Sequence, residues 1–471
     1  MGDTPSQHAG RVGLFAIGLD VYWQQFPGLK DRLQGYLRAV EERLRAAGAE
    51  VIAAGLVDTA SGAAEAGGLF ARSDLDLIVC HVATYATSSQ VLPVVQRAKV
   101  PVLVLNLQPA AALDYERTDT GEWLAHCSTC SVPEIANAFA RARVPFRVIS
   151  GMLYDDARAW GEIAGWCRAA GVARALRGSR IGFLGHTYPG MLDMYSDFTM
   201  ISAQTGAHIE VLEMCDLDQA VEQATAAEVE AKLEAARGTF ELENVGAEDL
   251  AWAARVAAGL DRMVAQFRLD GLAYYYRGCD GNRYERLAAG LILGNSLLTA
   301  RGIPASGEGD LKNCLAMKIL DCLGAGGSFT EFYAMDFREQ FVLMGHDGPA
   351  HLAIAARKPV LRGLGLYHGK RGRGVSVEFS VKTGPVTLVA MTQTAEGKLK
   401  LLTAEGESIP GPVLRIGNTN SRLRFPLPPA AFVDEWCRQG PTHHCALGVG
   451  HLRGAIEKVA ELMDLPFAAV C

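Results

Sequence analysis

The stretch LDLIVCHVATYATSSQVLPVVQRAKVPVLVLNL, residues 75–107, decides the fold class. It begins and ends with short apolar runs, at 75–82 and 100–107, and residues 88–98 between them have helical spacing. Apolar runs of this length are typical of strands that are buried on both faces of a parallel sheet. A strand, a helix and a second strand in this order are the unit from which open α/β sheets are built. The stretch therefore predicts an α/β domain.

The same alternation extends to both sides of this stretch and restarts near residue 177. After residue 375 the pattern changes to short alternating segments punctuated by Gly and Pro, which are typical of a barrel or sandwich. We therefore predict two open parallel-sheet α/β domains, 1–176 and 177–335, followed by a β-rich, barrel-like C-terminal domain, 336–471. The expected elements include helices at 30–47, 220–236, 284–300 and 452–463 and strands at 13–19, 51–56, 144–149, 180–184 and 413–416.

The charge balance limits the kinds of partner. Lys and Arg total 45 against 52 Asp and Glu, a net charge of −7, so the chain lacks the basic field of a general nucleic-acid binder. No run approaches the ~18 apolar residues of a membrane helix, and the polar N-terminus has no apolar core of signal-peptide length. The 11 Cys are scattered and odd in number, which favours a reducing compartment. We expect a cytoplasmic protein that binds a small molecule and has neither nucleic acid nor membrane among its partners.

Four residue positions that could bind a metal stand at the ends of predicted elements. Glu308 lies in Gly-Glu-Gly-Asp at a helix start, and Glu331 ends the string Gly-Gly-Ser-Phe-Thr-Glu. His346 follows a glycine at the end of an apolar strand, and the pair His443-His444 lies in a late turn. Two carboxylates and two imidazoles suit a first-row divalent metal, and the carboxylates favour Mn²⁺, Mg²⁺ or Co²⁺. Taken singly, each residue also has an ordinary interpretation as a helix-terminal charge or a hydrogen-bonded polar group.

The order of these strings resembles the L-arabinose isomerase family, which belongs to a wider fold group that includes L-fucose isomerase. The resemblance implies two α/β domains and one β-rich domain, in this order. It also implies a metal-dependent aldose–ketose isomerase, an intramolecular oxidoreductase, most commonly with Mn²⁺. The metal ligands that it implies are Glu308 and Glu331 in the central domain and His346 and His444 in the C-terminal domain, with His443 as the alternative to His444.

The chemistry of such a reaction needs proton transfer at two places on the sugar. An enediol route moves one proton between C2 and C1 and one between the two oxygens, and therefore needs an acid and a base. Glu308 and Glu331 are the candidates, and the sequence leaves open which is which. A metal-assisted hydride shift also stays open. So do two other functions: the same scaffold acting on a modified sugar, for which the basic loop 363–374 is a reason, and a non-catalytic sugar-binding protein.

The resemblance further implies where the sugar is contacted. Two loops differ from the arabinose enzymes and leave the sugar's identity open, one around Gln24 and one at 186–191. In the family, a histidine of the N-terminal domain completes the site of a neighbouring subunit, and the enzymes form trimers or hexamers. His126 lies at the matching place, so we expect a homotrimer or homohexamer. The predicted substrate-binding residues are His126, Gln24, His186, Tyr188, Met191 and Phe329.

Cys127 and Cys130 form an isolated C-x-x-C motif. A zinc site would need a second pair, and Cys437 with Cys445 does not have that spacing. A redox motif would need a thioredoxin-like neighbourhood. We therefore interpret both cysteines as small buried residues at a loop-to-helix junction, with metal or redox chemistry as the alternative.

Overall fold

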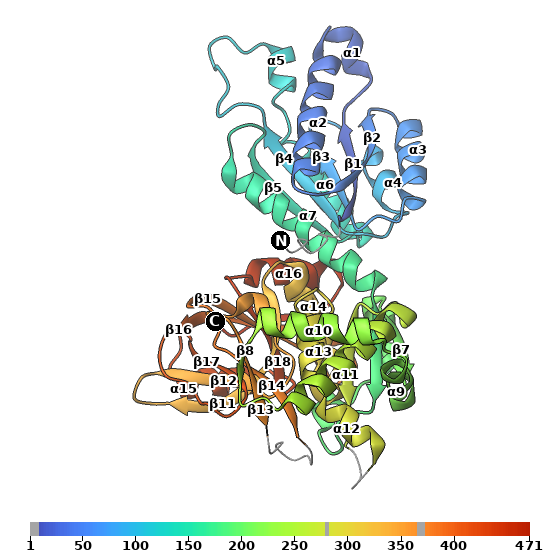
Figure 1. The fold of residues 1–471 in the computed structure, drawn as a ribbon. Coiled ribbons are helices and arrows are strands. Elements are labelled where there is room, and N and C mark those ends of the chain that lie inside the picture. The colour runs from blue at the N-terminus through green and yellow to red at the C-terminus, as the bar shows by residue number, and fades with distance from the viewer. Residues whose placement is uncertain (1–8, 278–281, 365–372) are drawn as a thin grey trace. The chain divides into compact units, whose positions relative to one another are not determined.

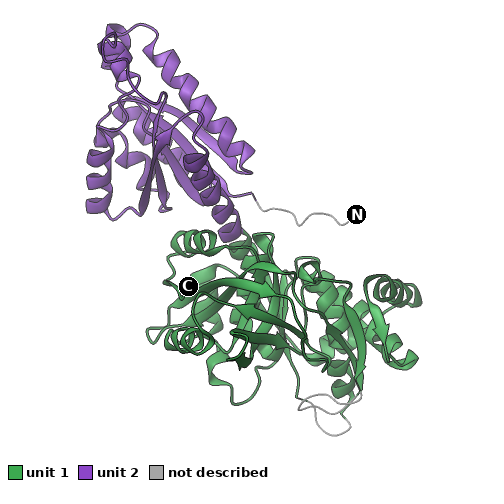
Figure 2. Ribbon diagram, turned by 90° about the vertical axis from the view of Figure 1, so that its left-hand side faces the viewer, with its two compact units in different colours: residues 1–6, 175–471 green, residues 7–174 purple. Residues whose placement is uncertain are grey.

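The structure, a computed structural model, describes residues 9–277, 282–364 and 373–471 (Figure 1). The central part of the predicted basic loop, residues 365–372, lies outside these ranges. The chain divides into two compact units, Gln7–Arg174 and Ala175–Cys471 (Figure 2). None of the helices in the described ranges is long and apolar enough to cross a membrane.

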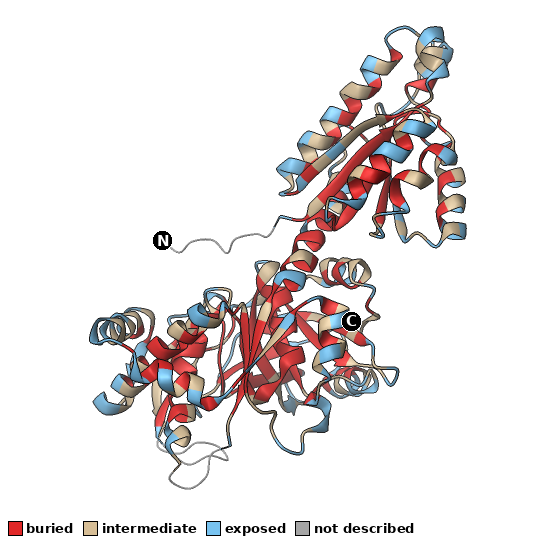
Figure 3. Ribbon diagram, turned by 90° about the vertical axis from the view of Figure 1, so that its right-hand side faces the viewer, coloured by how far each residue is buried: buried red, intermediate tan, exposed pale blue. Residues whose placement is uncertain are grey.

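The unit Gln7–Arg174 is built around a five-stranded parallel sheet of order β2-β1-β3-β4-β5. In this order the chain moves away from β1 in both directions, which is the flavodoxin-like arrangement. The three inner strands of this sheet are its most buried elements, whereas the edge strands β2 and β5 are partly exposed, and the covering helices expose their outer sides (Figure 3). The strands are β1 (Arg11–Ile17), β2 (Glu50–Val57), β3 (Leu77–His81), β4 (Val102–Gln108) and β5 (Phe146–Met152). The helices are α1 (Val21–Gln25), α2 (Leu29–Ala46), α3 (Ala60–Ala71), α4 (Leu92–Val95), α5 (Thr120–Leu124), α6 (Val132–Ala142) and α7 (Ala157–Gly178).

The unit Ala175–Cys471 begins with a second parallel sheet, of order β10-β9-β6-β7. Its strands are β6 (Arg180–Gly185), β7 (His208–Leu212), β9 (Gly271–Tyr275) and β10 (Ala305–Ser306). The helices are α8 (Phe198–Thr205), α9 (Met214–Glu222), α10 (Ala226–Thr239), α11 (Ala247–Phe267), α12 (Arg283–Ala289), α13 (Leu291–Thr299) and α14 (Leu311–Cys322). A small three-stranded sheet, β14-β13-β8, joins this part to the next through β8 (Glu241–Glu243), β13 (Val360–Leu364) and β14 (Gly374–Glu378).

The rest of this unit is a closed barrel of six antiparallel strands. The ladder runs β15-β18-β11-β12-β17-β16, and β16 pairs with β15 to close it. The buried helix α14 packs against β11, β15 and β18. The barrel strands are β11 (Gly326–Asp336), β12 (Phe341–His346), β15 (Gly384–Gln393), β16 (Leu399–Ile409), β17 (Thr419–Arg424) and β18 (His444–Val449). The remaining elements are β19 (Phe467–Ala469), which pairs in parallel with β16, and the helices α15 (Pro429–Arg438) and α16 (Arg453–Leu462).

The predicted fold class is therefore confirmed, and the differences are local. The helix expected at 88–98 is reduced to a 3₁₀ turn at 88–90 and the short α4, in whose first turn Pro93 lies. A proline has no N–H for an intrahelical bond and is tolerated at a helix start, so the helix begins there and not at residue 88. The helix expected at 220–236 is two helices, because Thr225 and Glu228 form a capping box that starts α10. The strand expected at 413–416 is absent from the described barrel. There the Asn420 side chain bonds the backbone N–H and carbonyl of Leu414, which takes the place of a neighbouring strand.

The position of Glu331 also differs from the expectation. The barrel begins at Gly326 with β11, so Glu331 lies on a barrel strand. The predicted boundary at 335–336 put it in the central domain. Glu308 precedes α14 and follows β10 of the parallel sheet.

Candidate metal centre

Three neighbouring barrel strands bring a carboxylate and two imidazoles together. On β11, Glu331 pairs with Gly345 of β12 on one side and with His444 of β18 on the other. His346 follows Gly345 at the end of β12, and its Nε2 lies 3.9 Å from Oε1 of Glu331. The antiparallel register therefore gathers side chains that are far apart in sequence.

Glu308 reaches the same place from a tight loop before α14. Its backbone is left-handed, with φ of 59°, and residues without glycine's freedom adopt that conformation at a cost. The neighbouring Gly309 also has positive φ, and a Cβ there would lie 2.5 Å from the carbonyl oxygen of His186. The loop thus needs glycine beside Glu308. It places Oε2 of Glu308 3.7 Å from Nε2 of His444.

The convergent atoms form two triads that share one histidine. Glu331, His346 and His444 make one triad, and Glu308, His443 and His444 make the other. In each triad the candidate ligand atoms lie within 4.8 Å of one another. The four predicted ligands thus lie together, and His443 lies beside them.

Asp310 fixes the orientation of His444. Both side chains are fully buried, and Nδ1 of His444 lies 3.0 Å from Oδ2 of Asp310. A carboxylate oxygen accepts, so Nδ1 carries the proton and Nε2 of the neutral ring presents its lone pair to the cluster. A metal-binding histidine usually has such a partner on its other nitrogen. The other oxygen of Asp310 accepts from the N–H of Asn313 and caps α14.

The donor set fits a divalent ion. Within the described ranges, two buried atoms of the cluster have no hydrogen-bond partner, namely Oε2 of Glu308 and Nε2 of His444, whereas Nδ1 of His346 lies 3.0 Å from Oδ1 of Asp347. Buried polar atoms are normally bonded, so their lack of a partner calls for an explanation. Two ligands of one ion at roughly 2.1 Å lie at most about 4.2 Å apart. The separations of 3.7 Å and 3.9 Å are within that limit.

Charges in the cluster shift pKa values in opposite directions. Burial lowers the pKa of His444, although Asp310 acts against it. Burial also lowers the pKa of His443, but its contacts with Glu308 and Asp193 outweigh burial and raise that pKa to about 9. Burial raises the pKa of Glu308, yet the three nearby histidines outweigh it, and the net shift is downward. A cationic His443 thus faces an ionised Glu308 near neutral pH.

Phe329 is part of the floor of the cluster. It is 2% exposed, and its ring centroid lies 4.2 Å from that of His346 and 4.4 Å from that of His444. Phe329 and Glu331 are two residues apart on β11, so both side chains lie on one face. Phe329 therefore packs against both predicted histidine ligands.

The turn 186–191 lies against the Glu308 loop. The N–H of Tyr188 donates to the carbonyl of Glu308 at 2.9 Å, and the ring of Tyr188 packs at a tilt against that of Tyr275 with centroids 4.7 Å apart. The His186 ring meets the edge of Tyr275 at 5.1 Å. Met191 is held in the turn by a backbone bond to Tyr188. Tyr188 therefore contacts the Glu308 loop directly, and His186 and Met191 lie in the same turn.

Gln24 and His126 belong to the other unit. Gln24 is exposed on α1. His126 lies just after α5, and its Nδ1 is 2.9 Å from the carbonyl oxygen of Glu122. Their predicted contacts with the sugar stay predictions.

Two acidic residues near the cluster were not predicted as part of the site. Asp310 stands in the Gly-Glu-Gly-Asp string, where its place before a helix is a recognisable cap signal. Asp193 accepts from both the backbone N–H and Nδ1 of His443, at 2.9 Å and 2.7 Å. Residue 193 lies just beyond the turn 186–191, and nothing in the sequence connects it with residue 443.

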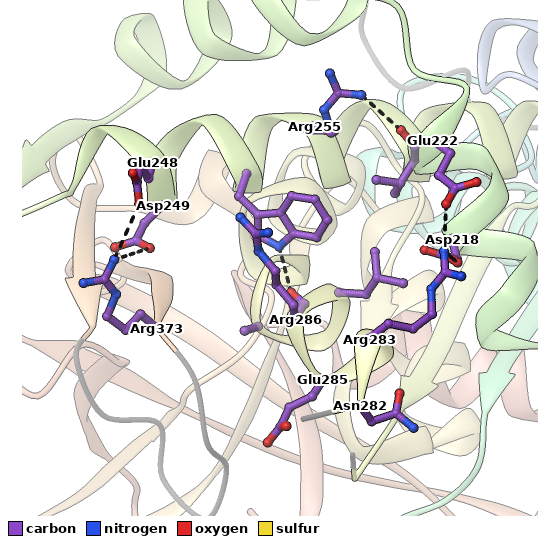
Figure 4. Close-up of a pocket in the computed structure, with 14 residues that line it drawn as sticks. Asp218, Glu222, Glu248, Asp249, Arg255, Asn282, Arg283, Glu285, Arg286 and Arg373 are labelled. Carbon is purple, nitrogen blue, oxygen red and sulfur yellow. Dashed lines mark hydrogen bonds and ion pairs between the residues drawn. The ribbon is translucent and has the colours of Figure 1, made fainter. Parts of the chain in front are cut away.

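A separate hollow of about 860 Å³ lies among α9, α11 and α12 (Figure 4). Arg283 donates to Glu222 at 2.7 Å, Arg373 lies 3.7 Å from Asp249, and Arg286 covers the ring of Trp252. Cations and carboxylates thus alternate along its wall. None of the predicted ligands is among its described lining residues.

The fold and the cluster define an α/β protein whose C-terminal barrel carries a centre of histidines and carboxylates. Residues 326–466 match the L-arabinose isomerase C-terminal domain family. A sulfoquinovose isomerase of Alkalicoccus urumqiensis is 22% identical, over 84% of this chain and 86% of its own length. Two L-arabinose isomerases also match. That of Herpetosiphon aurantiacus is 25% identical, over 70% of this chain and 68% of its own length. That of Aeromonas salmonicida is 22% identical, over 82% of this chain and 79% of its own length. The resemblance to the L-arabinose isomerase family that the motifs indicate is confirmed.

Proposed function

We propose that this chain is an aldose–ketose isomerase that depends on a divalent metal. The observation that carries the proposal is the partly buried cluster in which Glu308, Glu331 and His444 converge. Within the described ranges, Oε2 of Glu308 and Nε2 of His444 have no hydrogen-bond partner. The relatives support the reaction class, since those named above are isomerases of sugars by name.

Glu308, Glu331, His346 and His444 would hold the ion. Carboxylate oxygens with imidazoles favour Mn²⁺, with Mg²⁺ and Co²⁺ as alternatives. An ion bound there would act as a Lewis acid on two sugar oxygens. His444, neutral and oriented by Asp310, contributes a ligand without adding charge.

The two carboxylates are the proposed acid and base. Glu308 comes from the loop before α14 and Glu331 from β11, so they reach the cluster from different elements. One would take the proton from C2 and return it at C1, and the other would move the proton between the two oxygens. Phe329 and the aromatic turn at Tyr188 would border the sugar and limit access of water.

A second candidate is the same reaction on a sugar with an anionic substituent. The relative named sulfoquinovose isomerase covers 84% of this chain and 86% of its own length, as broad a match as the arabinose enzymes give. A test removes metal with a chelator, restores Mn²⁺, Mg²⁺ or Co²⁺, and measures ketose formation from L-arabinose, L-fucose and sulfoquinovose. Metal-restored turnover of any of them supports the proposal, and the preferred sugar separates the two candidates. Tight sugar binding without turnover under all three metals would instead indicate a binding protein.

We also propose a homotrimer or homohexamer in the cytoplasm, with His126 completing a neighbour's site. Mixing Glu331→Gln and His126→Ala subunits after dissociation should restore part of the activity, because some sites then combine two intact surfaces. A fully active monomer by light scattering would exclude this assembly. The free thiols of the described cysteines suit a reducing compartment.

A further inference from the structure

The motif Cys127-Ser128-Thr129-Cys130 has no part in the proposed reaction, and the structure gives it an unexpected geometry. The expectation of two buried residues holds for Cys127, which is 6% exposed, but not for Cys130, which lies at the surface. The Cys130 thiol lies 3.7 Å from the carbonyl oxygen of Cys127, and the neighbouring Cys130 contributes, after burial, to the raised pKa of the Cys127 thiol. An accessible sulfur thus lies next to a protected one.

The turn that holds the two sulfurs is anchored on both sides. The backbone N–H of Ser131 donates to the carbonyl of Ser128 at 3.2 Å. The hydroxyl of Ser131, which is fully buried, accepts from the N–H of Ala86 at 3.1 Å. Thr129 bonds the side chain of Asn106 at 3.2 Å. A disulfide tolerates only a narrow range of separations, and this turn already brings the Cys130 thiol against the backbone of Cys127, so little backbone movement is needed to form one.

We propose that Cys127 and Cys130 are a reversible dithiol–disulfide site that reacts with low-molecular-weight disulfides. Cys130 is the attacking residue, because it is exposed and small disulfides can reach it, whereas Cys127 is buried. Cys127 is the resolving residue, because it is protected and adjacent. Burial raises the pKa of its thiol to about 12, so it does not compete for the first step.

The exchange balances in two steps. The Cys130 thiolate attacks one sulfur of the small disulfide, whose S–S bond breaks, and one small thiolate leaves. Cys127 then gives up its proton, its sulfur attacks Sγ of Cys130, and the second small thiolate leaves. The two cysteines lose two electrons, the small disulfide gains them, and the two released protons end on the leaving thiolates.

The experiment uses the full-length assembled protein with glutathione disulfide as the probe. After acid quenching and alkylation, the tryptic peptide 118–141 contains both cysteines and no other. We expect this peptide to become resistant to alkylation and lighter by two hydrogen atoms, and to return to the dithiol form with excess glutathione. In Cys130→Ser the peptide should stay reduced, whereas in Cys127→Ser glutathione should remain attached to Cys130.

The controls keep the proposal falsifiable. Cys437→Ser removes another exposed cysteine and should leave the reaction of 118–141 unchanged. Cys130 is at the surface, so Cys130→Ser is expected to fold even if a change at the buried Cys127 does not. A stable glutathione adduct on Cys130 of the native chain would overturn the proposal. So would an unreacted 118–141 peptide at a glutathione disulfide concentration that modifies Cys437.

Discussion

Replacing Asp310 by Asn should change which nitrogen of His444 carries a proton. Asp310 accepts two hydrogen bonds, from the N–H of Asn313 and from Nδ1 of His444. Asn has one acceptor and one donor group. Because the helix cap needs the acceptor, the amide NH₂ is left facing Nδ1, which must then accept. The proton moves to Nε2, and the lone pair that faces Glu308 is lost.

The expected effect is a loss of metal affinity without loss of the fold. Removing the partner of a metal-bound histidine typically costs about 10–100-fold in affinity, which is about 1.4–2.8 kcal/mol. Asp310 and His444 are both 0% exposed, so water cannot replace the lost contact, and we expect the upper end of that range. Mn²⁺ binding can be titrated by the electron paramagnetic resonance signal of the free ion, with circular dichroism as the check on folding.

The matched control is Asp197→Asn. Asp197 caps α8 in the same way, accepting from the N–H of Met200 at 3.1 Å, and Asn is as good a cap as Asp. It should leave Mn²⁺ affinity unchanged. If Asp310→Asn binds Mn²⁺ as tightly as the parent protein, the proposed tautomer and its role are refuted.

Three further predictions follow from single side chains. Glu331→Gln should lower isomerase activity by ~10²–10⁴ with an unchanged circular dichroism spectrum; activity close to the parent's would remove Glu331 from the mechanism. Phe329→Ala should lower the free energy of unfolding by ~3–5 kcal/mol in urea titrations and weaken metal binding, because it leaves a cavity under His346 and His444. The control Phe337→Ala, at an exposed position, should change neither quantity. Burial lowers the pKa of His81 from 6.5 to about 4, so as the pH falls the unfolded chain takes up a proton at this residue before the folded chain does. The free energy of unfolding should therefore fall by about 3 kcal/mol between pH 6.5 and pH 4. His81→Gln should flatten that slope, and an unchanged slope would contradict the assignment.

The sequence pointed to this cluster because two of the predicted ligands have unusual local settings. Glu308 stands between two glycines, and His346 follows one, where a packing role is hard to fulfil. Which of His443 and His444 serves as the ligand depends on how β18 pairs with β11. His444 pairs with Glu331 in the β11–β18 ladder and is fully buried, whereas His443 precedes the strand and bonds Asp193. Such pairing depends on the folded barrel and cannot be read from adjacent residues.

The fold was predictable where apolar runs are long and was less so where side chains replace backbone pairing. The parallel strands of both sheets follow from runs such as 100–107, because burial on both faces leaves a continuous apolar pattern. The segment around Leu414 has a strand-like composition, yet the Asn420 side chain satisfies its backbone. The amphipathic helix α15 was not predicted, although its Phe432 and Trp436 recur at helical spacing and are buried.

The pairing of β11 with β18 has a consequence for the order of folding. These strands are neighbours in the barrel, yet β12 to β17 lie between them along the chain. Contacts of such large sequence separation carry a large loop-closure entropy and form late. Glu331 and His444 therefore meet only when the barrel closes, and a ribosome-bound chain that still lacks β18 has an incomplete ligand set. An ion that binds the complete set stabilises only the closed form, so it would select finished barrels over partly folded chains.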